Sequence, residues 1–166
     1  MNKSIYILIF CIIFINSSIC AAMKSIKVEQ AAIGGIAVNS SAEYIKSIYG
    51  DPNKMRSSVI KNSTDNQSIQ AETWYYGDTF QIDLVDGVAV SVVSSGNNGL
   101  ATPDGITVGM KKRNMTSKYG KPSQLDKYDK RAIYTYKIND KLQMIFITRD
   151  NIIVEMRMIH KSNEDQ

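Results

Sequence analysis

The side chains that could do chemistry are few in this 166-residue chain, and they lie far apart. The single histidine, His160, follows the last expected strand and is succeeded by Lys161 and a polar tail. Nucleophilic catalysis needs a nucleophile, a base and an orienting group, and a zinc site needs several His or Cys ligands. We therefore interpret His160 as a solvated terminal residue, and we expect no metal site and no cofactor.

Asp83 and Asp86 are the carboxylates whose spacing could suit general acid and base catalysis. Asp86 begins an Asp-Gly turn and Asp83 takes an outward strand position, so both residue types have a structural explanation. The chain contains neither a Gly-x-Gly-x-x-Gly motif nor a P-loop. We expect a protein that is not an enzyme. The alternative, a hydrolase of envelope polymers, would be indicated by a pocket that gathers two carboxylates from distant positions.

Residues 1–22 have the pattern of a secretory signal peptide. Lys3 precedes an apolar run from Ile5 to Ile15, which is shorter than the roughly 20 residues a membrane helix needs. Small residues around Cys20 and Ala22 satisfy the cleavage rule. We expect a periplasmic or secreted protein. Lipid attachment at Cys20 is a less favoured alternative, because the residues before it fit a lipoprotein signal poorly.

Composition points to an ordinary globular domain. The chain has 43% hydrophobic and 22% charged residues, which excludes a disordered tail or a fibre. Twenty basic and sixteen acidic side chains give a net charge of +4, a smaller basic excess than a dedicated nucleic-acid binder would carry. We therefore expect no nucleic acid among its partners.

An internal repeat organises the chain. Residues 35–52 match residues 105–122 without a gap, and both segments end in Tyr-Gly-x-Pro. In the first segment Ser40 and Glu43 have capping-box spacing, which predicts a helix start, and Gly50 sits where a left-handed helix stop is expected. Gly120 takes the matching place in the second segment.

Each matched segment is followed by sequence typical of antiparallel strands. Alternating apolar residues and the turn pairs Asp86-Gly87 and Asp150-Asn151 predict hairpins. The stretch Asn53–Gln70, rich in Ser, Asn, Thr and Asp, is interpreted as a polar connection. The sequence thus predicts an α+β fold of two tandem repeats, each a short helix or helix pair packed on a three- to four-stranded antiparallel meander. The expected segments are a signal peptide (1–22), repeat 1 (23–93), a linker (94–104), repeat 2 (105–160) and a polar tail (161–166).

The Gly-Ile-Thr-Val-Gly-Met motif at 105–110 and the helix ending Tyr-Gly-Lys-Pro at 119–122 resemble the BamE/SmpA/OmlA outer-membrane assembly family. A tandem pair of such units also resembles the β-lactamase-inhibitor protein (BLIP-like) superfamily. The resemblance implies a protein-binding module of the cell envelope that acts without catalysis. The alternative it implies is a secreted enzyme inhibitor, for which Asn53–Gln70 is the candidate protruding loop.

Two groups of residues are candidates for partner binding. The first is basic, because the excess of Lys and Arg lies in residues 104–166 and crowds an expected helix start at which Met110 replaces a capping serine. A solvated face is the ordinary explanation, and the functional one is an anionic partner, either lipid headgroups, an acidic envelope polymer or an acidic protein. The basic candidates are Lys111, Lys112, Arg113, Lys118 and Lys121.

The second group is apolar and is expected on the outer face of the last strands. Ile145, Ile147 and Ile153 stand beside charged and polar neighbours in the alternating pattern. An apolar patch with a charged rim indicates burial against something else. Contact with the other repeat is one interpretation, and contact with a protein partner in the envelope is the other.

We predict that export removes the first 20 or 22 residues, since a basic and apolar leader ending in small residues has no use in a folded domain. Intact mass spectrometry of the exported protein measures this. A mass that includes residue 1 would contradict the prediction, and a diacylglycerol adduct on Cys20 would establish the lipoprotein alternative.

Overall fold

The computed structural model describes residues 26–61 and 68–161. The expected signal peptide, Cys11 and Cys20 lie outside these residues. No helix in the described part of the chain is long and apolar enough to cross a membrane. The elements, in chain order, are η1 (Val28–Gln30), α1 (Ala42–Tyr49), β1 (Lys54–Lys61), β2 (Ser68–Tyr76), β3 (Phe80–Val85), β4 (Val88–Ser94), α2 (Lys112–Tyr119), β5 (Gln124–Tyr128), β6 (Arg131–Lys137), β7 (Leu142–Arg149) and β8 (Ile152–His160).

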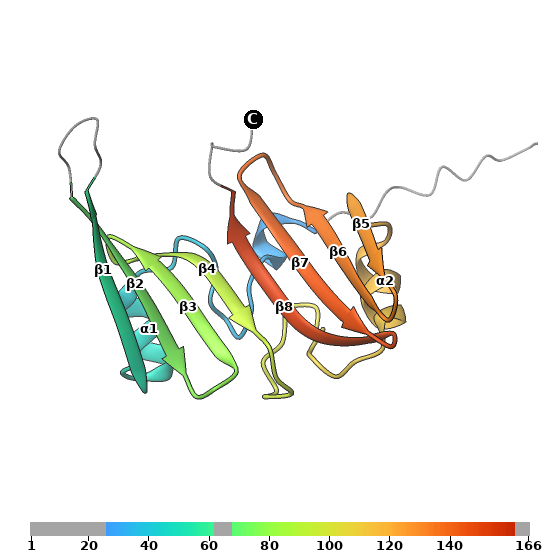
Figure 1. Ribbon diagram of the computed structural model, residues 1–166, viewed down its shortest axis with the longest axis horizontal. Coiled ribbons are helices and arrows are strands. Elements are labelled where there is room, and N and C mark those ends of the chain that lie inside the picture. Colours follow the sequence, from blue (N-terminus) through green and yellow to red (C-terminus); the bar gives the residue numbers. More distant parts are fainter. Residues whose placement is uncertain (1–25, 62–67, 162–166) are drawn as a thin grey trace, which may run out of the picture.

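The eight strands form one antiparallel sheet in the order β1-β2-β3-β4-β8-β7-β6-β5. Each half is a meander of hairpins, and the two meanders join through β4 and β8 at the centre (Figure 1). In this central pair Ser91 lies opposite Ile159 and Ser94 opposite Met156. The edges of the sheet are therefore β1 and β5.

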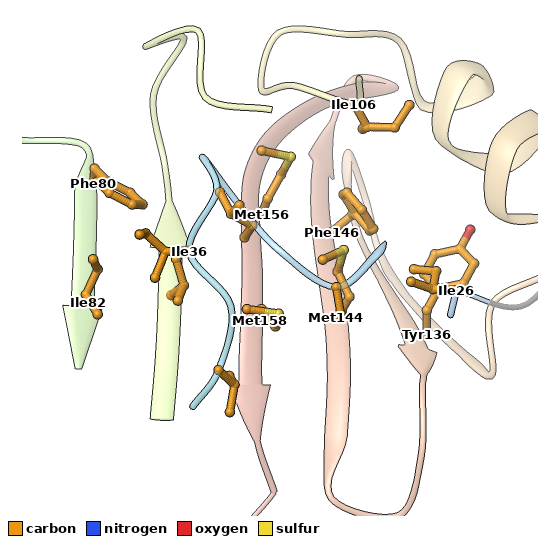
Figure 2. Close-up of a cluster of buried hydrophobic side chains, with 14 of the residues drawn as sticks. Ile26, Ile36, Phe80, Ile82, Ile106, Tyr136, Met144, Phe146, Met156 and Met158 are labelled. Atoms are coloured by element: carbon orange, nitrogen blue, oxygen red, sulfur yellow. The ribbon is translucent and has the colours of Figure 1, made fainter. Parts of the chain in front are cut away.

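Both helices and the N-terminal segment lie on the same face of the sheet (Figure 1). Each helix buries one stripe, with Ile45 of α1 and Met115 of α2 fully buried in a single hydrophobic cluster. The centre of the sheet is covered by irregular chain instead of a helix. Figure 2 shows the N-terminal segment crossing the central strands, with Ile36 beside β4 and Ile26 near Tyr136 of β6. One face of the sheet is thus packed, and the described residues leave the other open.

Each half ties its helix to its strands through a tyrosine and a glycine. The Tyr76 hydroxyl donates to the Gly50 carbonyl oxygen at 3.0 Å, and the Tyr136 hydroxyl donates to the Gly120 carbonyl oxygen at 3.1 Å. The last tyrosine of each helix packs against these strand aromatics, with ring centroids 5.3 Å apart for Tyr49 and Tyr76. An aromatic cluster in each half therefore fixes where its helix ends.

The expected helix stops and hairpin turns are present, with one change in conformation. Gly50 and Gly120 share a positive φ (73° and 75°), but their ψ angles of −161° and −146° place them outside the left-handed helical region. That combination is accessible in practice to glycine alone. Asp86-Gly87 and Asp150-Asn151 have positive φ at both residues, as two-residue hairpin turns of this type require.

The prediction of an α+β fold made of two tandem helix-on-meander repeats is wrong. The protein is mostly β, with one eight-stranded sheet and two eight-residue helices. Strand alternation reveals which side chains share a face, but it carries no information about which strand lies beside β4 or β8. The pairing of these two strands merges what the sequence suggested were separate units.

Two local expectations are also corrected. The stretch Asn53–Gln70 includes β1 and the start of β2. Residues 54–59 of this edge strand are all exposed, and such a strand needs no apolar alternation. Residues 62–67 lie outside the described chain. The helix cap is Ser41, whose hydroxyl accepts from the Tyr44 amide, while the Ser40 hydroxyl accepts from Ala37 instead. In the second half the cap position is held by Lys111, which makes no side-chain capping bond.

We predict that Gly120→Val and Gly120→Asn destabilise the protein alike, by about 1 kcal/mol or more. Gly120 has a φ of 75° and a ψ of −146°, so any side chain at this position strains the backbone. Asn is tolerated in the left-handed helical region but not at this ψ. Urea unfolding, with Lys121→Val as the control at an exposed neighbour, measures the effect. Wild-type stability in Gly120→Asn would contradict the assigned conformation.

We predict that stability falls between pH 10 and pH 12. Burial raises the pKa of Tyr119 and of Tyr136 to about 12. An unfolded tyrosine titrates near 10, so in this window the unfolded chain releases protons that the folded chain retains, which favours unfolding as pH rises. Urea unfolding at pH 9 and pH 11 should show a smaller loss for Tyr136→Phe than for the wild type. An equal loss would contradict the prediction.

Candidate functional site

One face of the sheet has neither helix nor N-terminal segment over it in the described chain (Figure 1). In β7, Gln143, Ile145 and Ile147 point to this face, because Met144 and Phe146 between them are buried in the core. The pairing register places Ile145 opposite Thr135 on one side and Arg157 on the other. Neighbouring strands therefore contribute to one continuous surface.

An apolar patch forms the centre of this face in the second half. Ile147 is only 5% exposed although no helix covers it, because its neighbours on the adjacent strands close around it. Ile133 lies directly opposite Ile147 on β6, and Glu155 lies opposite it on β8. The Arg157 side chain donates to the Glu155 carboxylate, and this ion pair borders the patch. The arrangement offers an apolar centre with a charged rim.

The structure places Ile145 and Ile147 on the open face but does not place Ile153 there. Ile153 is fully buried in the core on the helix-covered side, opposite Thr148. A bulge in β8 at Val154 shifts the alternation by one residue and turns Ile153 to the other face. The expectation that Ile153 shares the outer surface is corrected for this reason.

The open face of the first half is polar. The Asp83 carboxylate accepts hydrogen bonds from the Thr73 hydroxyl and the Gln81 amide, each at 2.9 Å. A shallow hollow of about 390 Å³ lies beside these residues and is bordered by Arg56 and Val90. Asp83 thus takes the outward strand position expected of it, within a side-chain network.

The basic candidates do not form one face. Lys118 forms an ion pair with Asp104 at 3.1 Å, and Asp104 also accepts from Gln30 at 2.9 Å, so Lys118 helps to hold the N-terminal segment. Lys112 lies six residues earlier, on the other flank of a helix with 3.6 residues per turn. Lys111 and Arg113 are exposed at the helix start, and Lys121 is exposed beyond its end.

A basic groove, which sequence reasoning missed, lies between α2 and the β5–β6 hairpin. Its volume is about 190 Å³, and its cations come from the helix start and from the hairpin. Tyr134 and Thr148 form part of its wall, and Asp129 is its one acidic residue. The three basic residues within 127–131 were the available signal in the sequence. The register of the β5–β6 hairpin is what places them beside α2. The cations lining the basic groove are Lys112, Lys127, Lys130 and Arg131.

The first half has an acidic groove in the matching position. It measures about 610 Å³, and its carboxylates are Glu43, Glu72 and Asp86. The indole N–H of Trp74 and the side-chain amide of Gln70 donate to the Glu72 carboxylate at 2.7 and 2.6 Å. The Lys46 ammonium lies 5.3 Å from the centre of the Trp74 ring. A pocket therefore does gather carboxylates from distant positions, as the hydrolase alternative requires.

The carboxylates of the acidic groove accept hydrogen bonds from neighbouring groups. Hydrogen bonds from its own backbone amide and from the Ser41 hydroxyl lower the pKa of Glu43. Asp86 accepts from the Gln70 amide at 2.9 Å and belongs to the β3–β4 turn. A general acid at neutral pH needs a carboxyl group whose pKa is raised, so the lowered pKa of Glu43 does not suit that role.

His160 lines a fourth hollow, of about 420 Å³, between the N-terminal segment and the β6–β7 turn. Val28 and Leu142 provide apolar walls, and Asn39 and Asp140 provide polar ones. Among the described residues, no three His, Cys, Asp or Glu side chains gather closely enough to hold a metal ion.

Comparisons with known proteins bear on the fold. No protein-family model matches the chain, and no curated protein matches it. A cysteine-rich secretory protein from Staphylococcus aureus is 11% identical with a TM-score of 0.51, and an extracellular protein with an SCP domain from Bacillus anthracis is 13% identical with a TM-score of 0.49. Each match covers 75% of this chain and 44% of the other.

A further structure, the uncharacterised protein yfeY from Escherichia coli, is 13% identical with a TM-score of 0.45. That match covers 81% of this chain and 99% of the other. At such low identities the likeness concerns the fold alone. This chain spans less than half the length of the S. aureus and B. anthracis proteins.

Proposed function

We propose that the protein is an exported, non-catalytic binding protein that docks a protein partner on its open sheet face. The observation that carries the proposal is the apolar patch around Ile145 and Ile147, which has strand neighbours but no covering layer in the described chain. Apolar centres with polar rims are typical of protein interfaces. The patch fits a partner surface that has an apolar centre and, beside it, a polar group that can bind the Glu155–Arg157 ion pair.

Export is part of this proposal. The leader pattern of residues 1–22 supports it, although those residues lie outside the described chain. The fold likeness to a secretory protein from S. aureus agrees with it. The expected family relationship to envelope assembly proteins or to enzyme inhibitors stays a prediction, and either relationship would make the partner a protein.

The position of the patch on the open face favours a partner over contact with the other half. Both meanders lie in one sheet, so neither half folds over the open face of the other. The interpretation in which Ile145 and Ile147 contact the other repeat therefore has no counterpart in the described structure. What remains is a partner supplied from outside the described chain.

We predict that a photoreactive amino acid at Thr135 or Ile145 cross-links one common polypeptide in the envelope fraction of the source cells. Both side chains are half-buried on the open face. The same photoreactive residue at Ile48, which is 45% exposed on the helix-covered side, is the control. Equal cross-linking of the same polypeptide from Ile48 would contradict the proposal.

The cross-linked partner then allows a quantitative test. Ile145→Lys places a charge in the apolar patch, and losing the burial of one isoleucine weakens binding about tenfold or more. Lys137→Gln, at an exposed neighbouring position, should leave affinity unchanged. Thermal unfolding of both variants verifies that they fold. Unchanged affinity in folded Ile145→Lys would contradict docking at this patch.

A further inference from the structure

The basic groove and the acidic groove occupy equivalent places in the two halves of the sheet. The amide of Lys112 donates to the Asn151 carbonyl, as the amide of Ala42 does to Gly87, both at 2.8 Å. The Lys130 carbonyl oxygen accepts from the Asp150 amide at 2.9 Å, as the Gln70 carbonyl oxygen accepts from the Asp86 amide at 2.8 Å. The same backbone framework therefore surrounds both grooves.

Comparing the two grooves shows which side chains the shared backbone framework does not require. Lys112 stands where the first half has Ala42, and Lys130 where it has Gln70. Lys127 lies opposite Ala132 in the hairpin, in the place where Ser57 lies opposite Glu72. Neutral side chains at the three matched positions support the same local structure, so the backbone framework does not require the cations.

The cations of the basic groove are not neutralised internally. None of Lys112, Lys127, Lys130 and Arg131 forms an ion pair with another described residue, although Asp129 lines the same groove. Like charges brought together repel one another, and an anion between them reverses the sign of that interaction. Elsewhere in this half, Lys118 and Arg157 do have carboxylate partners.

We propose that the basic groove binds a phosphate group. Its volume of about 190 Å³ is below the ~300–1,000 Å³ typical of pockets for whole small molecules, so it suits one anionic group. Lys supplies point charges, and the Arg131 guanidinium can hold two phosphate oxygens at once. The phosphate is either free or part of a lipid headgroup. This site is separate from the open sheet face and does not depend on the function proposed for that face.

The test compares two triple variants of the exported, processed protein that lose the same charge. Lys112→Ala with Lys127→Ser and Lys130→Gln transfers the first-half residues into the basic groove. Lys54→Gln with Lys137→Gln and Lys141→Gln removes three exposed cations elsewhere. Because the first half already holds Ala, Ser and Gln at the matched positions, we expect the groove variant to fold, and amide NMR spectra verify it.

Titration with inorganic phosphate, with chloride at equal ionic strength as the reference, is followed by amide NMR. We expect saturable shifts at Lys112, Lys130 and Arg131 that weaken at least tenfold in the groove variant and remain in the charge-matched control. Binding should also weaken as ionic strength rises from about 0.01 M to 0.15 M, where the screening length falls from about 30 Å to 8 Å. Absence of saturable shifts, or equal weakening in both variants, overturns the proposal.

Cosedimentation with phosphatidylglycerol and phosphatidylcholine vesicles then distinguishes the sources of the phosphate. Loss of phosphatidylglycerol binding in the groove variant alone supports a lipid headgroup as the ligand. Phosphate binding in solution without groove-dependent vesicle binding supports a free phosphate. Vesicle binding that is equal for both variants, together with no response to inorganic phosphate, overturns the site.

Discussion

The pairing of β4 with β8 is the contact on which the rest of the architecture depends. Four residue pairs, from Ser91–Ile159 to Ser94–Met156, join two meanders into one sheet. Without it, both central strands would expose unpaired backbone groups and apolar side chains, which is a surface prone to aggregation. With it, the edges are β1 and β5, which carry charged residues such as Lys54 and Lys127.

The open face follows from the same pairing. A helix of eight residues is about 12 Å long, whereas eight strands about 4.8 Å apart span more than 30 Å. Two such helices and the N-terminal segment cover one face (Figure 1). Ile33 and Ile36 of that segment are fully buried. The described chain supplies no second layer. Apolar residues on the other face, such as Ile147, are shielded within the described chain only by their strand neighbours, and it is on this face that we propose a partner docks.

Local structure was largely predictable from the sequence, and long-range pairing was not. The Asp86-Gly87 turn and the stop at Gly50 follow from the backbone freedom of single residues, so short motifs revealed them. The polar edge strand β1 was missed because its residues 54–59 are all exposed. Ile153 was assigned to the wrong face because the bulge at Val154 reverses the alternation without a marker in the sequence.

The candidate site shows the same division between local and long-range information. The sequence revealed a basic excess in the second half. The ion pair with Asp104 shows that one of these cations, Lys118, has a structural role. The hairpin register brings another, Lys127, toward Lys112. Positions that carry the framework, such as Gly50 and Gly120, are the same in both halves. Positions that the framework leaves free differ in charge, as Glu43 and Arg113 do. The fold fixes the framework positions and tolerates change at the free positions. A binding preference can therefore arise from the residues that differ between the two grooves, without loss of stability.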